Sequence, residues 1–167
     1  METMEPIVHS FTYSLNYLRE MIADVPEELM TAQPNGIANH PAWTIGHLVF
    51  ISQEIGGVIG IAPWLSADWA QQFGPGSSVH RRYQDARSKS DLLAALGTAR
   101  AKLISAVTEL SDAQLDAPFP DPTYADVCPT VRHALTQVLL GHTAFHIGQI
   151  SVWRRAMNLP PMARSYE

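Results

Sequence analysis

Four segments of the chain repeat apolar residues at intervals of three or four, which is the spacing of an α-helix. They cover about residues 7–23, 41–59, 91–110 and 131–157, and no convincing alternating strand lies between them. The third segment carries the repeat Leu92, Leu96, Ala99, Leu103, Ala106 and Leu110. The pattern therefore predicts an all-α fold.

Residues that start or stop helices lie at the edges of these segments. Pro41 suits the first turn of the second helix, and Ser90 and Thr130 suit the N-caps of the third and fourth. Leu159 and the two prolines after it should stop the fourth helix.

A long connection separates the second and third predicted helices. The segment from about Gly60 to Lys89 contains Pro63 and the run Gly74-Pro75-Gly76, which disfavour regular structure. Its aromatic residues should pack onto the helices: Trp64, Trp69 and Phe73. We therefore expect a single domain over residues 1–167, a four-helix bundle with a long connection between helices 2 and 3.

Charge and cysteine content narrow the class of function. The net charge of −5 gives no basic patch for nucleic acid, and no apolar run approaches the roughly 20 residues that span a bilayer. Cys128 is the only cysteine, so no intrachain disulfide is possible, and no secretory signal is visible at the N-terminus. These features predict a cytoplasmic protein that binds neither nucleic acid nor a membrane.

Two histidines lie on the side of the fourth predicted helix that should be apolar. A helix turns about 100° per residue, so His142, His146 and Gln149 in "GHTAFHIGQI" share one narrow stripe, which leucines extend backward into the core. His133 falls nearly opposite His142 and should lie outside any site. The other histidines outside the stripe are His9, His40 and His80.

The second predicted helix places His47 and Glu54 on its own core-facing stripe. Buried imidazoles and carboxylates are costly unless they are paired or bind a metal. His47, His142 and His146 together suit one divalent transition metal with an open coordination position, zinc or nickel ahead of iron or copper. Glu54 would be a fourth ligand or hold a ligand in place, and Gln149 would orient water or substrate.

Other interpretations of these residues remain open. A core histidine is often only hydrogen-bonded, and the three rings would then bond to one another. Glu54 and Gln149 would likewise only make hydrogen bonds within the core. A metalloprotease helix of the His-Glu-x-x-His type is disfavoured because Thr143 follows the first histidine.

The sequence resembles the DinB-like superfamily, close to its YfiT-like metal-dependent hydrolase branch, across nearly the whole chain. The matching stretches are "NHPAWTIGHL" (39–48), "WAQQFGPGSS" (69–78), "ELSDAQLDAPFPD" (109–121) and "GHTAFHIGQISVWRRAMNLPP" (141–161). The last, with its His-x-x-x-His-x-Gly-Gln pattern, is the most specific.

This resemblance implies a four-helix bundle with a metal near one end, held by His47, His142 and His146. It also implies a homodimer. Many relatives have Glu where this chain has Thr143, so a general base borrowed from the family has no counterpart here. Characterised relatives include S-transferases and isomerases that use low-molecular-weight thiols.

Two functions follow as expectations. The first is a metal-dependent enzyme, a thiol S-transferase or a hydrolase, that acts on a small molecule and in the transferase case uses a thiol co-substrate. Glu54 and Gln149 would assist orientation or proton transfer. The alternative is a non-catalytic, dimeric, stress-related module whose metal stabilises the bundle. In either case metal affinity should fall as histidines protonate, around pH 6.5 for an unperturbed ring.

Overall fold

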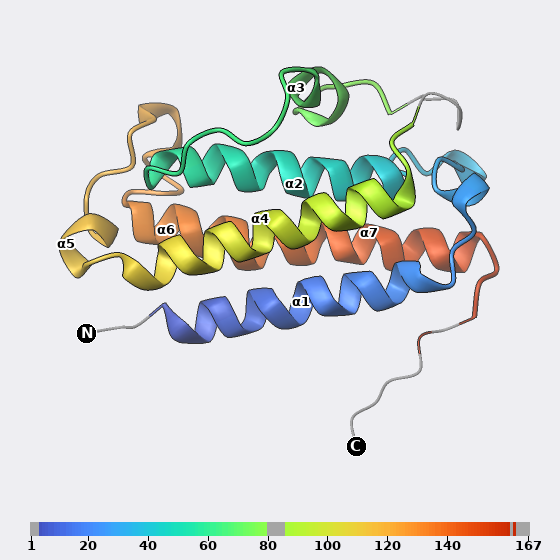
Figure 1. Cartoon of the computed structure of the whole chain (residues 1–167), viewed down its shortest axis with the longest axis horizontal. Helices are drawn as coiled ribbons and strands as arrows, with labels where there is room; N and C mark the ends of the chain where they lie inside the picture. Colours follow the sequence, from blue (N-terminus) through green and yellow to red (C-terminus); the bar gives the residue numbers. More distant parts are fainter. Residues whose placement is uncertain (1–3, 80–85, 161, 163–167) are drawn as a thin grey trace.

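The computed structural model describes residues 4–79, 86–160 and 162, and in these residues the regular structure is helical. Four long helical rods run side by side (Figure 1). They are α1 (Glu5–Ala23), α2 (Pro41–Val58), α4 (Lys89–Glu109) and a fourth rod made of α6 (Val131–Thr136), η5 (Gln137–His142) and α7 (Thr143–Ala156). The predicted four-helix bundle is confirmed.

The rods close into a ring around one core. α1 contacts α4, α4 contacts α2, α2 contacts α7, and α7 contacts α1. Leu18, Leu103 and Trp153 are fully buried between them. The apolar repeats that predicted the helices are therefore the faces that pack together.

Helix ends agree with the sequence in part. Thr130 caps α6, since its hydroxyl accepts the backbone N–H of His133, and Pro41 lies in the first turn of α2. The prediction that Ser90 caps the third helix is wrong. Ser88 is the cap: its side chain accepts the N–H of Asp91 at 3.1 Å, and the helix starts at Lys89.

The connection between α2 and α4 packs onto the bundle, as its aromatic residues predicted. It contains the short helix α3 (Asp68–Phe73), which lies outside α2 (Figure 1). Trp69 and Phe73 are buried, and Trp64 is partly buried against the core. Short elements complete the remaining connections: η1 (Glu27–Leu29), η2 (Pro34–Gly36), α5 (Asp112–Leu115) and η4 (Pro122–Tyr124).

The fourth rod departs from a regular α-helix just before the histidine motif. Residues Gln137–His142 form a π-helical turn, in which the chain is wider than in an α-helix. The hydroxyl of Thr143 donates to the carbonyl of Val138, five residues back, at 3.0 Å. π-helical turns are rare, and those that do occur often lie at functional sites.

Candidate metal centre

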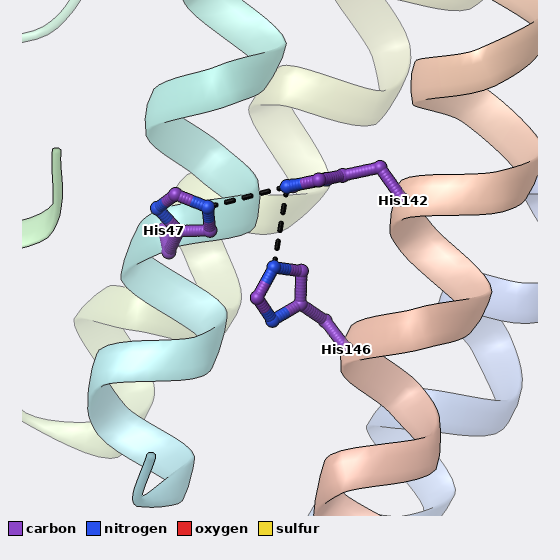
Figure 2. Close-up of side chains that lie close together, drawn as sticks. All are labelled: His47, His142 and His146. Carbon is purple, nitrogen blue, oxygen red and sulfur yellow. Dashed lines mark hydrogen bonds between the residues drawn. The ribbon is translucent and has the colours of Figure 1, made fainter. Parts of the chain in front are cut away.

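Three histidines from two rods meet in the interior of the bundle. His47 comes from α2, His142 ends the π turn, and His146 lies one turn further on α7 (Figure 2). The Nε2 atom of His142 is 3.2 Å from the Nε2 atoms of both His47 and His146. In the described part of the chain, these are the residues that bring three possible metal-ligand atoms together, within 4.8 Å of one another.

The outer nitrogen of His47 is held by α3. Its Nδ1 lies 2.7 Å from the carbonyl oxygen of Phe73, which can only accept, so Nδ1 carries the proton. Gly46 makes this approach possible, because a Cβ at that position would lie 2.3 Å from the Phe73 ring. The Nε2 lone pair of His47 therefore faces the other two histidines.

Trp43 stacks against the face of the His47 ring. The two rings stack with centroids 4.6 Å apart and planes 9° from parallel. The indole Nε1 of Trp43 donates to the hydroxyl of Ser77 at 2.9 Å. The long connection thus fixes the His47 ring twice, through the Phe73 carbonyl and, by way of Trp43, through Ser77.

The outer nitrogen of His146 is held by Gln149, one turn along α7. His146 Nδ1 lies 2.9 Å from Gln149 Oε1, and the side-chain amide of Asn39 donates to the same oxygen at 3.0 Å. An amide oxygen accepts, so His146 also carries its proton on Nδ1 and turns its Nε2 lone pair inward. Gln149 therefore lies next to His146, on the stripe that the helix spacing predicted.

Hydrogen bonds among the three rings cannot satisfy them all. With both other lone pairs facing it, His142 can donate from Nε2 to one ring only, which leaves the other unsatisfied. Its Nδ1 is buried and has no hydrogen-bond partner among the described residues. A cation at the centre would accept all three Nε2 lone pairs, so the donor set fits a metal better than the hydrogen-bonded interpretation does.

The protonation of the site favours the same conclusion. Burial, with the neighbouring His146 and His47 adding to it, lowers the pKa of His142 to about 4. Burial and His47 lower the pKa of His146 to about 4, against the hydrogen bond to Gln149. Burial also lowers the pKa of His47, opposed by the Phe73 carbonyl. All three rings are therefore neutral near pH 7, the form that binds metals.

The spacing of the donors suits a small divalent ion. Two nitrogens that each lie about 2.0–2.1 Å from a tetrahedral zinc are separated by about 3.3–3.4 Å. The two Nε2 separations of 3.2 Å are close to that value. Two of the three donor separations therefore match the spacing around such an ion, and the third pair, His47 and His146, lies within 4.8 Å.

The expectation that Glu54 points into the core is wrong, because its side chain is exposed. It lies two turns beyond His47, about 10 Å further along α2. In the described residues, none of the hydrogen bonds of the three rings is to a carboxylate. A carboxylate without a partner is less costly in water than in the core, which accounts for its position.

The remaining histidines lie outside the cluster where they are described. His133 and His9 are exposed, as expected for His133 from its place on the helix. His40 is buried but has another role: its Nδ1 accepts the backbone N–H of Trp43 and caps α2, and its Nε2 contacts the Val79 carbonyl at 2.6 Å. His80 lies outside the described residues.

The sequence profile of the DinB superfamily matches residues 10–150, which include all three histidines. The chain belongs to the DinB superfamily. A comparison with curated proteins gave no match. In this DinB-superfamily chain, Thr143 is buried and its hydroxyl is used within the π turn, so it does not act as a base toward the cluster.

Sequence reasoning missed three contributors to this DinB site. The Phe73 carbonyl is a backbone group and leaves no residue-type signature. Gly46 and Asn39 lie inside the stretch "NHPAWTIGHL", but their partners are distant in sequence, and Asn39 meets Gln149 across 110 residues.

No helix in the described part of the chain is both long and apolar enough to cross a membrane.

Proposed function

We propose that this protein binds one divalent transition metal through His47, His142 and His146 and is a metal-dependent enzyme, a thiol S-transferase or a hydrolase. The observation that carries the proposal is the convergence of three neutral imidazoles whose Nε2 atoms contact only one another among the described residues. Three neutral donors leave the full charge of the ion in place, and zinc or nickel suits them ahead of iron or copper.

The protein's own residues would prepare the ligands. The Phe73 carbonyl and Gln149 hold the outer nitrogens of His47 and His146, so the Nε2 lone pairs of both rings would face the ion. When bound, the ion would supply Lewis acidity, which favours the deprotonated form of a water or a thiol at an open position. Gln149 is our candidate for orienting substrate, and Glu54, which is exposed two turns along α2 from His47, is our candidate for moving a proton.

The identity of the nucleophile and of the partners is part of the proposal. We favour a small-molecule substrate, with a low-molecular-weight thiol as co-substrate in the transferase case. The net charge of −5 supports the exclusion of nucleic acid. The single buried cysteine, Cys128, supports a cytoplasmic location.

A homodimer is also proposed. The resemblance to the superfamily implies it, and large apolar side chains on the outer side of α7 support it: Phe145 is 64% exposed and Val152 is 54% exposed. Sedimentation at micromolar concentration tests this proposal, and a species of only the monomer mass, 18.4 kDa, contradicts it.

One observation favours the non-catalytic alternative. His47 and His146 are each only 5% exposed, and no carboxylate contacts the three rings in the described residues. A metal in such surroundings would serve to tie α2 to α7. In that case its removal should lower the melting temperature strongly and no turnover should depend on it.

The experiment that separates the two functions begins with protein stripped by a chelator and reloaded with zinc, nickel, iron or copper. Each form is assayed for conjugation of a low-molecular-weight thiol to an aryl halide and for hydrolysis of nitrophenyl esters. An enzyme gives turnover that requires the metal, survives His133→Ala and is lost in His142→Ala. Absence of metal-dependent turnover, with a large loss of thermal stability on metal removal, favours the structural module instead.

A further inference from the structure

We infer that Asn39 is a positioning residue of the metal site, which acts through Gln149 to set which nitrogen of His146 carries the proton. The inference rests on the proposed metal-binding function and extends it to a residue that is not a ligand. Asn39 lies just before α2, in the segment that follows η2, and it is half-buried.

One oxygen atom joins the three side chains. Gln149 Oε1 lies 3.0 Å from Asn39 Nδ2 and 2.9 Å from His146 Nδ1. A carbonyl oxygen has two lone pairs and accepts both hydrogen bonds at once. The hydrogen bonds thus connect Asn39 through Gln149 to the Nδ1 atom of His146, which donates.

The orientation of the Gln149 amide decides the tautomer of His146. With Oε1 toward the ring, Nδ1 carries the proton and Nε2 offers a lone pair to the ion. With the NH₂ end toward the ring, Nδ1 must accept, the proton moves to Nε2, and the ligand atom is blocked. In the structure the Nδ2 end of Asn39 faces Gln149, and a donor at that place favours the first orientation over the second.

Of the two ligand rings whose Nδ1 atom has a hydrogen-bond partner, only His146 is held by a side chain that can turn over. The Nδ1 atom of His47 faces the Phe73 carbonyl, a backbone group that accepts in every orientation of the neighbouring side chains. A glutamine, in contrast, presents two chemically opposite ends with nearly equal shape. A second group must therefore fix it, and Asn39 is the side chain in contact with its oxygen.

Four variants test the inference: Asn39→Ala, Asn39→Asp, Gln149→Glu and the double variant that combines Asn39→Ala with Gln149→Glu. Their zinc affinity is measured by competition with a chelator at pH 7. Asn39→Ala removes the selecting donor, and Asn39→Asp replaces it with an acceptor that favours the wrong orientation of Gln149. Loss of a group that orients a ligand costs roughly 10- to 100-fold in metal affinity. We expect the loss for Asn39→Asp to exceed that for Asn39→Ala.

Gln149→Glu supplies the decisive background. A carboxylate accepts with either oxygen, so it needs no selecting donor, and zinc should bind this variant more tightly than the wild type. Adding Asn39→Ala to Gln149→Glu should then change zinc affinity by less than about 2-fold. A merely structural role for Asn39, which ties the segment before α2 to α7, gives the same loss in both backgrounds.

Asn16→Ala is the matched control, because Asn16 lies on α1 and also makes a side-chain hydrogen bond, to Arg100. It should leave zinc affinity unchanged. Far-ultraviolet circular dichroism and thermal melts establish that each variant is folded.

A second measurement reads the tautomer directly. Long-range proton–nitrogen NMR of the metal-free protein at pH 7 should find the His146 proton on Nδ1 in the wild type and a shift toward Nε2 in Asn39→Asp. An unchanged tautomer, an unchanged affinity in Asn39→Ala, or equal losses in the two backgrounds overturns the inference. If the wild type itself binds no zinc, the proposed function fails, while the NMR result still decides the hydrogen-bond relay.

Discussion

Acidification should weaken zinc binding far less at this site than at a site made of ordinary histidines. Protons compete with the metal for each ligand ring, and affinity falls once the pH drops below the pKa of the metal-free folded protein. Burial lowers the pKa of both His142 and His146 to about 4. The acid transition that the sequence places around pH 6.5 therefore moves well below that value.

The size of the effect follows from these pKa values. Between pH 7 and pH 5, a ligand with a pKa of 6.5 weakens zinc binding about 25-fold, and one with a pKa of 4 weakens it about 1.1-fold. Protonation of His142 and His146 together should therefore weaken zinc binding about 1.2-fold between pH 7 and pH 5, instead of about 600-fold. His47, whose pKa is also lowered, adds less than about 25-fold, so the total stays below about 30-fold.

The assay is zinc competition against a chelator of known proton affinity at pH 7, 6 and 5, with circular dichroism at each pH to establish that the bundle is folded. Three unperturbed ligands would weaken binding roughly 10⁴-fold over this range. A measured loss of about 10³-fold or more, in folded protein, would falsify the claim that burial holds these rings neutral.

Three further predictions concern stability. The lowered pKa values mean that unfolding of the metal-free protein takes up protons around and below pH 6.5, so its free energy of unfolding, measured by urea titration, should be level above about pH 7.5 and decrease as the pH falls toward 4. Gly46→Ala should lower the free energy of unfolding by about 1–3 kcal/mol and weaken zinc binding, because the new Cβ displaces Phe73. Gly57→Ala is the control: it lies in the same helix with open space around it and should leave stability unchanged or raise it. Equal effects of the two substitutions would contradict the argument. Leu103→Ala should cost about 2–5 kcal/mol in thermal or urea unfolding while the metal stoichiometry stays unchanged, and a loss below about 1 kcal/mol is incompatible with the full burial of Leu103.

Local sequence patterns predicted most of the bundle, because apolar spacing is a direct record of which helix face is buried. They failed where the outcome depends on hydrogen-bond geometry. Ser88 and Ser90 both precede the third apolar repeat, and only the backbone conformation decides that Ser88 is the cap. The π turn before Thr143 has no composition of its own that distinguishes it from an α-helix.

The candidate site was predictable to the extent that it follows helix periodicity. His142 and His146 lie four residues apart beyond most of the π turn, so their shared face did not depend on it. Glu54 lies on the same stripe as His47 by periodicity, yet its side chain is exposed, and periodicity alone does not predict that difference. Asn39 was hidden because its role depends on contact with Gln149, which the fold creates and the sequence spacing does not reveal.

The central claim is that His47, His142 and His146 bind one metal ion, and metal stoichiometry tests it most directly. Wild type, His142→Ala and His133→Ala are stripped with a chelator, reloaded with zinc, desalted and measured by elemental analysis alongside circular dichroism. We predict one zinc per chain in the wild type and in His133→Ala, and none in His142→Ala with its helical content retained. Stoichiometric zinc in His142→Ala, or none in the wild type, contradicts the assignment.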